Sequence, residues 1–328
     1  GDTHPEALSD YAKDFNVKTT YLDYREMMAK EELDIVSVCS WDPQHAEMTI
    51  AAAAYKPKVI LCEKPMAISL GEGEAMVVAC KRNDVKLAIG HQRRFFSAWN
   101  EARRMIQDGA IGEPLRLWTG VRAGMLNTGT HGIDFQLYAL GDVQAEWVMG
   151  SVERKTDHHI FGHRVEDRCC GLIGYPGGAV GVIENELSGE YRVGATITGT
   201  EGMMDVQGNS LKYMTQSKAG WQEFETTETN TKGYGDAFVA QAYGICEWIE
   251  GKVEEYRGEG KYGKAALEIM MAVYESARVH ERVMLPLQTR DNPLDVAVEE
   301  GRIPVERPGF WDERSFLVRG ESMSWTNR

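Results

Sequence analysis

A lysine follows an apolar, β-rich run in the first third of the chain. The segment "KVILCEK" (58–64) ends in Glu63 and Lys64 and is followed by Pro65, so Lys64 is expected just past the carboxyl end of a buried strand. Its ammonium group can hold a substrate hydroxyl and favour the alkoxide form. Burial beside other positive charges would lower its pKa and suit it to proton transfer. Pro65 restricts the backbone and so aims the lysine. A solvated Glu–Lys pair at a strand end explains the same spacing equally well.

A second group of polar residues lies in "NTGTHGID" (127–134). Asn127, His131 and Asp134 are spaced i, i+4 and i+7, which places them on one face of a helix. His131 would stand in the first turn, where the helix dipole disfavours the imidazolium and leaves a neutral ring, as a general base requires. Asp134 can accept the other ring N–H and set the tautomer. The structural alternative is a histidine packed against a strand, with Asn127 or Thr128 as the helix cap.

The segment "GEGKYGK" (258–264) matches the dinucleotide-binding pattern G-x-G-x-x-G and the first seven letters of the P-loop pattern. Its context fits neither site. A dinucleotide loop follows a buried strand, whereas the charged segment "EGKVEEYR" precedes this one. A P-loop lysine is followed by Ser or Thr, whereas Ala265 stands here. We therefore interpret the segment as a connection between two helices.

Two other kinds of site are not indicated. The segment "TDHHIFGH" (156–163) brings together three histidines and an aspartate, but no Cys or Glu completes a recognised metal-binding spacing, and we predict no metal site. No G-x-S-x-G nucleophile elbow occurs in the chain.

The elements that must position these residues follow two patterns. Up to residue 92, apolar β-rich runs (33–40, 58–64 and 86–92) alternate with helical patterns (43–54 and 70–83). This alternation is typical of β-α-β units with a parallel sheet buried on both faces. From 144 to 227, strand-like runs follow one another, with the turn "PGG" (176–178) between two of them, which favours an antiparallel sheet.

We therefore predict an α/β fold: a doubly wound Rossmann domain over residues 1–93, then an α+β domain over 94–328 with a large, open, mainly antiparallel sheet. Further helices are expected over 97–108, 131–141, 236–250 and 264–280, and the last 40 residues show no strong periodicity. Ligands of doubly wound sheets bind outside the carboxyl ends of the strands. Residues 40–45, 62–67 and 91–95 therefore matter most.

The first residues fit the later part of a Rossmann unit whose first elements would precede residue 1. Its ribose-binding acid ends the second strand, about 20 residues after the glycine loop. Asp2, followed by the helix-like "PEALSDYAKDF" (5–15), occupies the equivalent place, and the chain starts without methionine. We expect roughly 30 residues, including the first β-α unit, upstream of Gly1. The alternative is a complete chain whose sheet starts at residue 33.

Charge and cysteine content exclude several partners. The chain of 328 residues carries 36 basic and 50 acidic residues, a formal net charge of −14. This charge disfavours nucleic acid and anionic membranes. No apolar run reaches membrane-spanning length and no signal peptide is recognisable. The six cysteines form no C-x-x-C pair, and we interpret them as reduced thiols of a cytoplasmic protein.

Taken together, the motifs resemble the Gfo/Idh/MocA family of oxidoreductases, the relatives of glucose–fructose oxidoreductase and inositol dehydrogenase. The resemblance covers essentially the whole chain and rests on Glu63-Lys64-Pro65, "GHQRRF" (90–95), "GTHGIDFQLYALGD" (129–142) and "ALEIMMAVYESARVHERVMLPL" (266–287). It implies a Rossmann domain that binds NAD in preference to NADP. It also implies an α/β domain whose open sheet often forms the interface of a dimer or tetramer.

The resemblance also implies residue roles. Lys64 is similar to the family's active-site lysine and His131 to its catalytic histidine, whereas Asn127 stands where the family usually has Asp. The cofactor residues implied are Asp2, Ser40, Trp41, His45, Glu63, Lys64, Gln92 and Arg93, with the Trp41 ring packing on nicotinamide or ribose. Arg122, Asn127, Asp134 and Tyr234 are the implied substrate contacts.

The implied reaction is hydride transfer between a nicotinamide cofactor and a sugar, inositol or related polyol. His131 would take the hydroxyl proton while Lys64 stabilises the oxygen. Two alternatives remain open: hydrolysis of glycosides through transient oxidation by bound NAD, and a non-catalytic sugar-binding protein.

Overall fold

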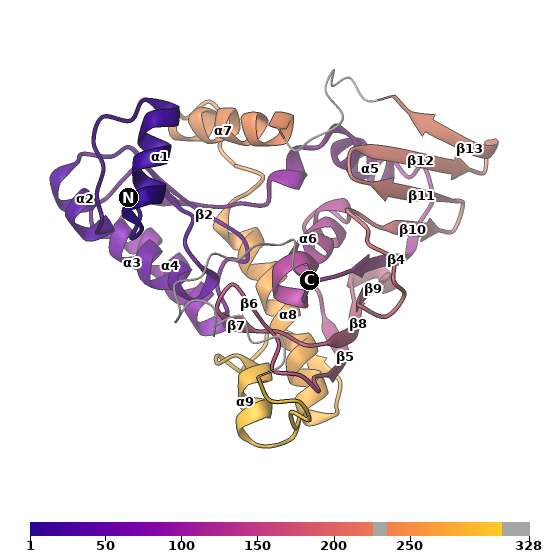
Figure 1. Ribbon diagram of the computed structural model, residues 1–328. Helices are drawn as coiled ribbons and strands as arrows, with labels where there is room; N and C mark the ends of the chain where they lie inside the picture. The colour runs from indigo at the N-terminus through magenta and orange to yellow at the C-terminus, as the bar shows by residue number, and fades with distance from the viewer. Residues whose placement is uncertain (226–234, 310–328) are drawn as a thin grey trace.

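The computed structural model describes residues 1–225 and 235–309. Figure 1 shows a small sheet with its helices on one side of the molecule and a large sheet on the other, with α8 (Gly260–Val279) running between them. The predicted combination of a Rossmann-like sheet with a large, mainly antiparallel sheet is confirmed.

The small sheet is parallel and lies in the order β1-β2-β3. β2 and β3 are mostly buried, with Ile60 and Ile89 at 0% exposure, as expected for apolar runs covered on both faces. β1 differs from this expectation, because its residues alternate between exposed and buried and Ile35 is 40% exposed. The elements of this part are α1 (Pro5–Phe15), α2 (Tyr24–Lys30), β1 (Ile35–Val38), η1 (Asp42–Gln44), α3 (His45–Ala53), β2 (Val59–Cys62), α4 (Leu70–Arg82), β3 (Lys86–Ile89) and η2 (Gln92–Phe95).

The large sheet has nine strands in the order β13-β12-β11-β10-β4-β9-β8-β5-β14. All neighbours pair antiparallel except β4 and β9, and the turn η4 (Pro176–Gly178) joins β8 to β9 as predicted. The strands are β4 (Pro114–Val121), β5 (Trp147–Glu153), β8 (Arg168–Gly174), β9 (Val180–Asn185), β10 (Thr196–Gly199), β11 (Gly202–Gln207), β12 (Ser210–Thr215), β13 (Lys218–Phe224) and β14 (Val283–Met284). A separate hairpin consists of β6 (His159–Ile160) and β7 (His163–Arg164).

Helices cover one face of the large sheet. α5 (Ser97–Gln107), α6 (Thr130–Ala139) and α8 pack on this face, while the π-helical turn η3 (Met125–Gly129) leads into α6. α7 (Gly235–Ile249) lies against η2. Within the described residues, no helix is both long enough and apolar enough to cross a membrane.

The segment "GEGKYGK", expected as a connection between two helices, lies partly inside a helix. α8 begins at Gly260, four residues before the predicted start, so the later glycines lie inside the helix. A Cβ atom at Gly260 would come within 2.9 Å of Leu87, and one at Gly263 within 2.6 Å of Ile89. These glycines therefore allow α8 to approach β3 closely, which is a packing role.

A short helix, α9 (Pro293–Glu299), lies in the C-terminal region where no periodicity was found. The Asn292 side chain caps it by accepting a hydrogen bond from Leu294 N–H, and Pro293 stands at its start. Only two turns long, α9 buries Leu294 and Ala297. A seven-residue helix has too few apolar positions to show a helical periodicity, so the sequence did not predict α9.

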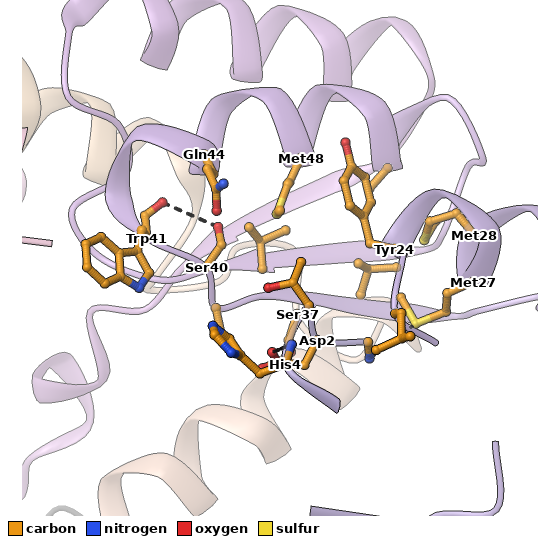
Figure 2. A pocket seen from close by; sticks show the side chains of 17 residues that line it. Asp2, His4, Tyr24, Met27, Met28, Ser37, Ser40, Trp41, Gln44 and Met48 are labelled. Atoms are coloured by element: carbon orange, nitrogen blue, oxygen red, sulfur yellow. Dashed lines mark hydrogen bonds between the residues drawn. The ribbon is translucent and has the colours of Figure 1, made fainter. Parts of the chain in front are cut away.

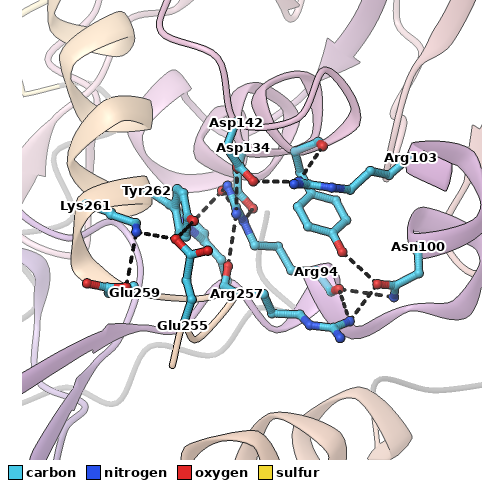
Figure 3. A network of polar contacts seen from close by, with 12 residues as sticks. Arg94, Asn100, Arg103, Asp134, Asp142, Glu255, Arg257, Glu259, Lys261 and Tyr262 are labelled. Carbon is cyan, nitrogen blue, oxygen red and sulfur yellow. Dashed lines mark hydrogen bonds and ion pairs between the residues drawn. The ribbon is translucent and has the colours of Figure 1, made fainter. Parts of the chain in front are cut away.

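A buried ion pair ties the end of β3 to α6 (Figure 3). Arg94 and Asp134 are both fully buried, with Arg94 Nε 2.8 Å from Asp134 Oδ1 and Nη2 2.7 Å from the same oxygen. Arg94 Nη1 also reaches Asp142 Oδ1 at 2.8 Å and donates to the Arg257 carbonyl at 2.9 Å. One guanidinium thus joins η2, α6, the turn after α6, and the segment before α8.

We expect Asp134→Asn to destabilise the protein strongly, because Arg94 would lose one of its two carboxylate partners while it stays excluded from water. The free energy of unfolding should fall by about 3–5 kcal/mol, the usual effect of breaking a buried pair on one side. Asp108→Asn, which removes an exposed partner of Arg104 on α5, should cost about 0–1 kcal/mol. Urea denaturation of both variants measures the difference; equal effects would contradict this account.

Candidate active site

Lys64 lies just past the carboxyl end of β2 and contacts Asn127 in η3. Its Nζ donates to Asn127 Oδ1 at 2.9 Å and to the Asn127 carbonyl at 3.2 Å. Burial lowers the pKa of Lys64; Asp42 and Glu63 act in the opposite direction, and Arg93 lowers the pKa further. The lysine is therefore not the solvated end of a surface ion pair. It is held across the gap between the two sheets.

The helical turn η3, which carries Asn127, is held in place by the buried carboxylate of Glu166. Glu166 Oε1 accepts from Met125 N–H at 2.7 Å and from Asn185 Nδ2 at 2.9 Å. Its other oxygen accepts from the Tyr274 hydroxyl at 2.5 Å. Since Met125 opens η3, Glu166 fixes the start of the turn from which both Asn127 and His131 follow.

His131 stands in the first turn of α6, as predicted, and is 3% exposed. Its pKa is lowered well below its usual value, first by burial and then by the charges of Arg93 and Lys64. The ring is therefore neutral at pH 7. Its Nδ1 is buried without a hydrogen-bond partner among the described residues.

Asp134 does not occupy the position expected for it. Its carboxylate binds Arg94 and lies 3.3 Å from His91 Nδ1. No hydrogen bond to His131 is formed within the described residues. The i, i+3 spacing from His131 to Asp134 was compatible with contact, but the guanidinium of Arg94 takes the carboxylate. At 0% exposure, Asp134 also has no surface to offer a substrate.

The residues after β1 divide into two groups. Ser40 and Trp41 line a cavity beside β1. His45 is fully buried instead, with its ring nitrogens 2.8 Å from the Pro65 carbonyl and 3.1 Å from the Ser40 carbonyl. His45 therefore holds the two strand-end loops together, and its ring is not available for the direct cofactor contact expected of it.

The cavity beside β1 has a volume of about 390 Å³. Asp2, His4 and Ser37 are among the residues that line it, and in Figure 2 these lie between Trp41 on one side of the view and Met27 on the other. The Asp2 side chain accepts the His4 N–H at 2.8 Å. The Trp41 ring packs edge-on against Phe161, 6.4 Å between centroids, so the β6–β7 hairpin supports the tryptophan.

Three more predicted residues lie near the end of β2 or β3. The Glu63 carboxylate accepts the Lys64 N–H at 3.1 Å and packs against Gly90. Gln92 is 8% exposed, and its Oε1 has no hydrogen-bond partner among the described residues. Arg93 Nη2 donates to the Tyr191 hydroxyl at 3.0 Å.

Two predicted substrate contacts remain, Arg122 and Tyr234, and the carbonyl of Arg122 accepts the hydroxyl of Thr128, the neighbour of Asn127. Arg122, at the end of β4, is exposed and donates to the Gly189 carbonyl. Tyr234 falls outside the described residues. Within the described part of the chain, no three His, Cys, Asp or Glu side chains gather in a way that could hold a metal ion.

His91 and Tyr191 were missed by sequence reasoning. His91 immediately precedes Gln92 at the end of β3, and its ring lies 5.8 Å from that of His131. His91 falls inside the predicted strand run 86–92 and in the segment 91–95 that was singled out, but no role was predicted for it. Tyr191 comes from the loop after β9, 98 residues beyond Arg93, and no local pattern indicates that it reaches this region.

The arrangement fits a dinucleotide cofactor and a hydroxylated substrate. Asp2 at the β1 cavity is suited to ribose hydroxyls. Buried polar atoms without partners usually have a functional reason, and His131 Nδ1 and Gln92 Oε1 are two such atoms near the carboxyl ends of the parallel strands. A lysine beside a neutral histidine can bind and deprotonate a hydroxyl group.

Comparison with protein families decides the assignment of the chain. Residues 1–91 match the model described as the oxidoreductase family with an NAD-binding Rossmann fold, and residues 120–205 match the GFO/IDH/MocA C-terminal domain. The two models together span more than half of the chain. The chain belongs to the Gfo/Idh/MocA family.

Curated relatives of this family member include two dehydrogenases. The chain is 29% identical over 205 residues to myo-inositol 2-dehydrogenase of Thermotoga maritima, covering 58% of this chain and 60% of that protein. It is 33% identical over 113 residues to D-apiose dehydrogenase of Paraburkholderia graminis, covering 34% and 30%. The chain thus spans at most about 60% of the length of these relatives.

The fold is also that of solved structures. Levoglucosan dehydrogenase in complex with NADH and levoglucosan superposes with a TM-score of 0.76 at 23% identity, over 87% of this chain and 89% of that one. Aldose–aldose oxidoreductase from Caulobacter crescentus gives 0.73 at 23% identity, over 86% and 90%. At this identity, the likeness establishes the fold.

We expect Asn127→Asp to raise the pKa of Lys64 by about 1–3 units, because it places a carboxylate beside the ammonium group. The pH dependence of acylation at Lys64, followed by mass spectrometry of its peptide, measures this change. Asn83→Asp, at the C-terminal end of α4, serves as a control that should leave Lys64 unchanged. An unaltered profile in Asn127→Asp would contradict the contact between Lys64 and residue 127.

Proposed function

We propose that this protein is an NAD-dependent dehydrogenase or reductase that acts on a CH–OH group of a sugar, inositol or related polyol. One observation carries the proposal: Lys64 is fixed on Asn127, and a neutral His131, whose Nδ1 has no partner among the described residues, follows four residues later in the same helical segment. Family membership and the dehydrogenases among the curated relatives support it.

Lys64 binds the substrate oxygen. Its Nζ has three donors, and Asn127 takes up to two of them. The remaining donor is available to a substrate hydroxyl, and its charge favours the alkoxide as the proton leaves. Asn127 keeps its own amide N–H groups for a second substrate hydroxyl.

His131 is the general base in oxidation and the general acid in reduction. A neutral imidazole can accept the hydroxyl proton, and the nearby charges of Lys64 and Arg93 then favour its release from the ring. Orientation matters as much as basicity, because the reacting atoms must be held at about 3–3.5 Å.

In this proposal, NAD binds along the carboxyl ends of the parallel strands. Asp2, Ser40 and Trp41 would hold the adenosine side and the ribose, and Gln92 and Arg93 the nicotinamide side. Bound NAD supplies the hydride acceptor in oxidation and the hydride donor in reduction. The carboxylate of Asp2 favours NAD over NADP, since it would repel a 2′-phosphate.

The proposal is tested by titrating the full-length protein with NADH and NADPH, followed by nicotinamide fluorescence, and by a polyol screen with NAD. Saturable binding with NADH preferred, and NADH formation from a polyol, are expected. Conversion of a glycoside without NADH accumulation would favour the transient-redox alternative. Sugar binding without any turnover would leave a non-catalytic protein.

His131→Asn should lower kcat by about 10²–10⁴-fold, the usual contribution of a general base, while NADH binding is retained. His280→Asn is the matched control, since His280 is exposed at the end of α8 in a left-handed conformation that Asn tolerates. Steady-state kinetics of both variants with the best polyol give the comparison. Wild-type kcat in His131→Asn would exclude its role in proton transfer.

The uncovered face of the large sheet is the proposed interface of a homo-oligomer. Met149, Leu172, Val182 and Trp118 form one cross-strand row through β5, β8, β9 and β4. Met149 and Leu172 are 47% and 42% exposed. A contiguous apolar patch of this kind is typical of an association surface.

The double variant Met149→Lys/Leu172→Lys should therefore dissociate the oligomer, because it places two charges in the centre of the contact. Sedimentation velocity measures the change in mass. Val78→Lys, on α4 and 45% exposed in the wild type, should leave the mass unchanged. Equal masses for the double variant and the wild type would rule out this face as the interface.

A further inference from the structure

His91 lies between β3 and the first turn of α6. It is 1% exposed, and both of its ring nitrogens face α6. Nε2 is 3.0 Å from Thr130 Oγ1, and Nδ1 is 3.3 Å from Asp134 Oδ1. The imidazole therefore spans the first turn of the helix, from the residue before His131 to the residue three positions after it.

The partners fix the tautomer of His91. Asp134 is held by Arg94 as a carboxylate and can only accept. Nδ1 therefore carries the hydrogen, and Nε2 accepts the Thr130 hydroxyl. Burial lowers the pKa of His91 to about 4; Asp134 acts in the opposite direction, and the charges of Arg94, Lys64 and Arg93 lower the pKa further. The ring is thus neutral at pH 7, with a defined donor and acceptor.

This ring packs directly on His131. The two imidazoles meet edge to face, with 5.8 Å between centroids and 65° between planes. No hydrogen bond orients His131 within the described residues. Packing must therefore set its orientation, and His91 provides that contact from a ring that is itself tied at both ends.

We propose that His91 is a positioning residue for the reaction, which fixes the orientation of the His131 ring through Thr130, Asp134 and its own edge-to-face contact. The consequence for turnover rests on the proposed function of His131. Phe at position 91 would keep the ring contact and lose both tethers. Val at position 130 would remove only the hydroxyl that Nε2 accepts.

Loss of the tethers has two expected effects. The His131 ring would sample orientations away from the substrate oxygen, and kcat should fall by roughly 10–100-fold with little change in KM, as small misplacements do. A loosened first turn would also admit water, so the pKa of His131 should rise toward 6.5. Arg93, Lys64 and residue 91 are the charged or titratable groups that act on His131.

The experiment uses the full-length protein and the variants His91→Phe, Thr130→Val and Thr130→Ser. NMR of ¹³C-labelled histidine follows the His131 titration without cofactor, and kinetics give kcat and KM separately. The proposal expects a raised His131 pKa and a lowered kcat in His91→Phe and Thr130→Val, with Thr130→Ser close to wild type because it keeps the hydroxyl.

A merely structural role for His91 predicts a different result. His91→Phe and Thr130→Val would then lower the melting temperature while the His131 titration and kcat stay as in the wild type, which would overturn the proposal. If His131→Asn retains full activity, the proposed function fails, yet the NMR titration still decides whether His91 positions the ring. If His91→Phe folds poorly, Thr130→Val still tests the proposal, because it removes only the hydroxyl that His91 Nε2 accepts.

Discussion

The buried pair between Arg94 and Asp134 is the constraint on which the site depends. Both groups are fully excluded from water, so each charge depends on its buried partners: Asp134 on Arg94, and Arg94 on Asp134 and Asp142. The pair also fixes the distance between β3 and α6, because Arg94 follows β3 and Asp134 belongs to α6. The helix that carries His131 is thereby held against the end of the parallel sheet, and Asp142 and the Arg257 carbonyl extend the same restraint to neighbouring segments. A reaction that needs side chains from both sheets requires such a contact to keep the two sheets in register.

Two further contacts complete the placement of the site. Lys64 on Asn127 joins the end of β2 to η3, and Glu166 on Met125 joins η3 to the large sheet. Lys64 and His131 thus come from different layers: His131 belongs to the helical segment η3–α6, and Lys64 contacts the same segment at Asn127. Groups restrained in this way need little reorganisation when a substrate binds, which is the general advantage of preorganised sites. Positioning also explains why so many polar groups are buried here, because these charged side chains hold the reacting groups in place as well as tuning their reactivity.

The sequence predicted the two sheets and the positions of Lys64 and His131, because apolar periodicity and strand-end location are local properties. It failed where a contact is made by residues far apart in the chain. Asp134 was expected to serve His131, but Arg94 takes its carboxylate. His45 was expected at the cofactor, but the carbonyls of Ser40 and Pro65 enclose its ring. The glycines before Lys264 were interpreted as a connection between helices, yet their packing on β3 was visible only once α8 and the sheet were placed together.

The neutral side chain of Asn127 matters for the charge balance around Lys64. Burial and Arg93 lower the pKa of this lysine, whereas Asp42 and Glu63 raise it. A third carboxylate at the place of the Asn127 amide oxygen, 2.9 Å from Nζ, would raise the pKa of Lys64. The amide oxygen of Asn127 offers the same hydrogen bond without the charge. It therefore holds Lys64 in position while leaving its proton easier to exchange, which is a combination that a carboxylate at this position does not provide.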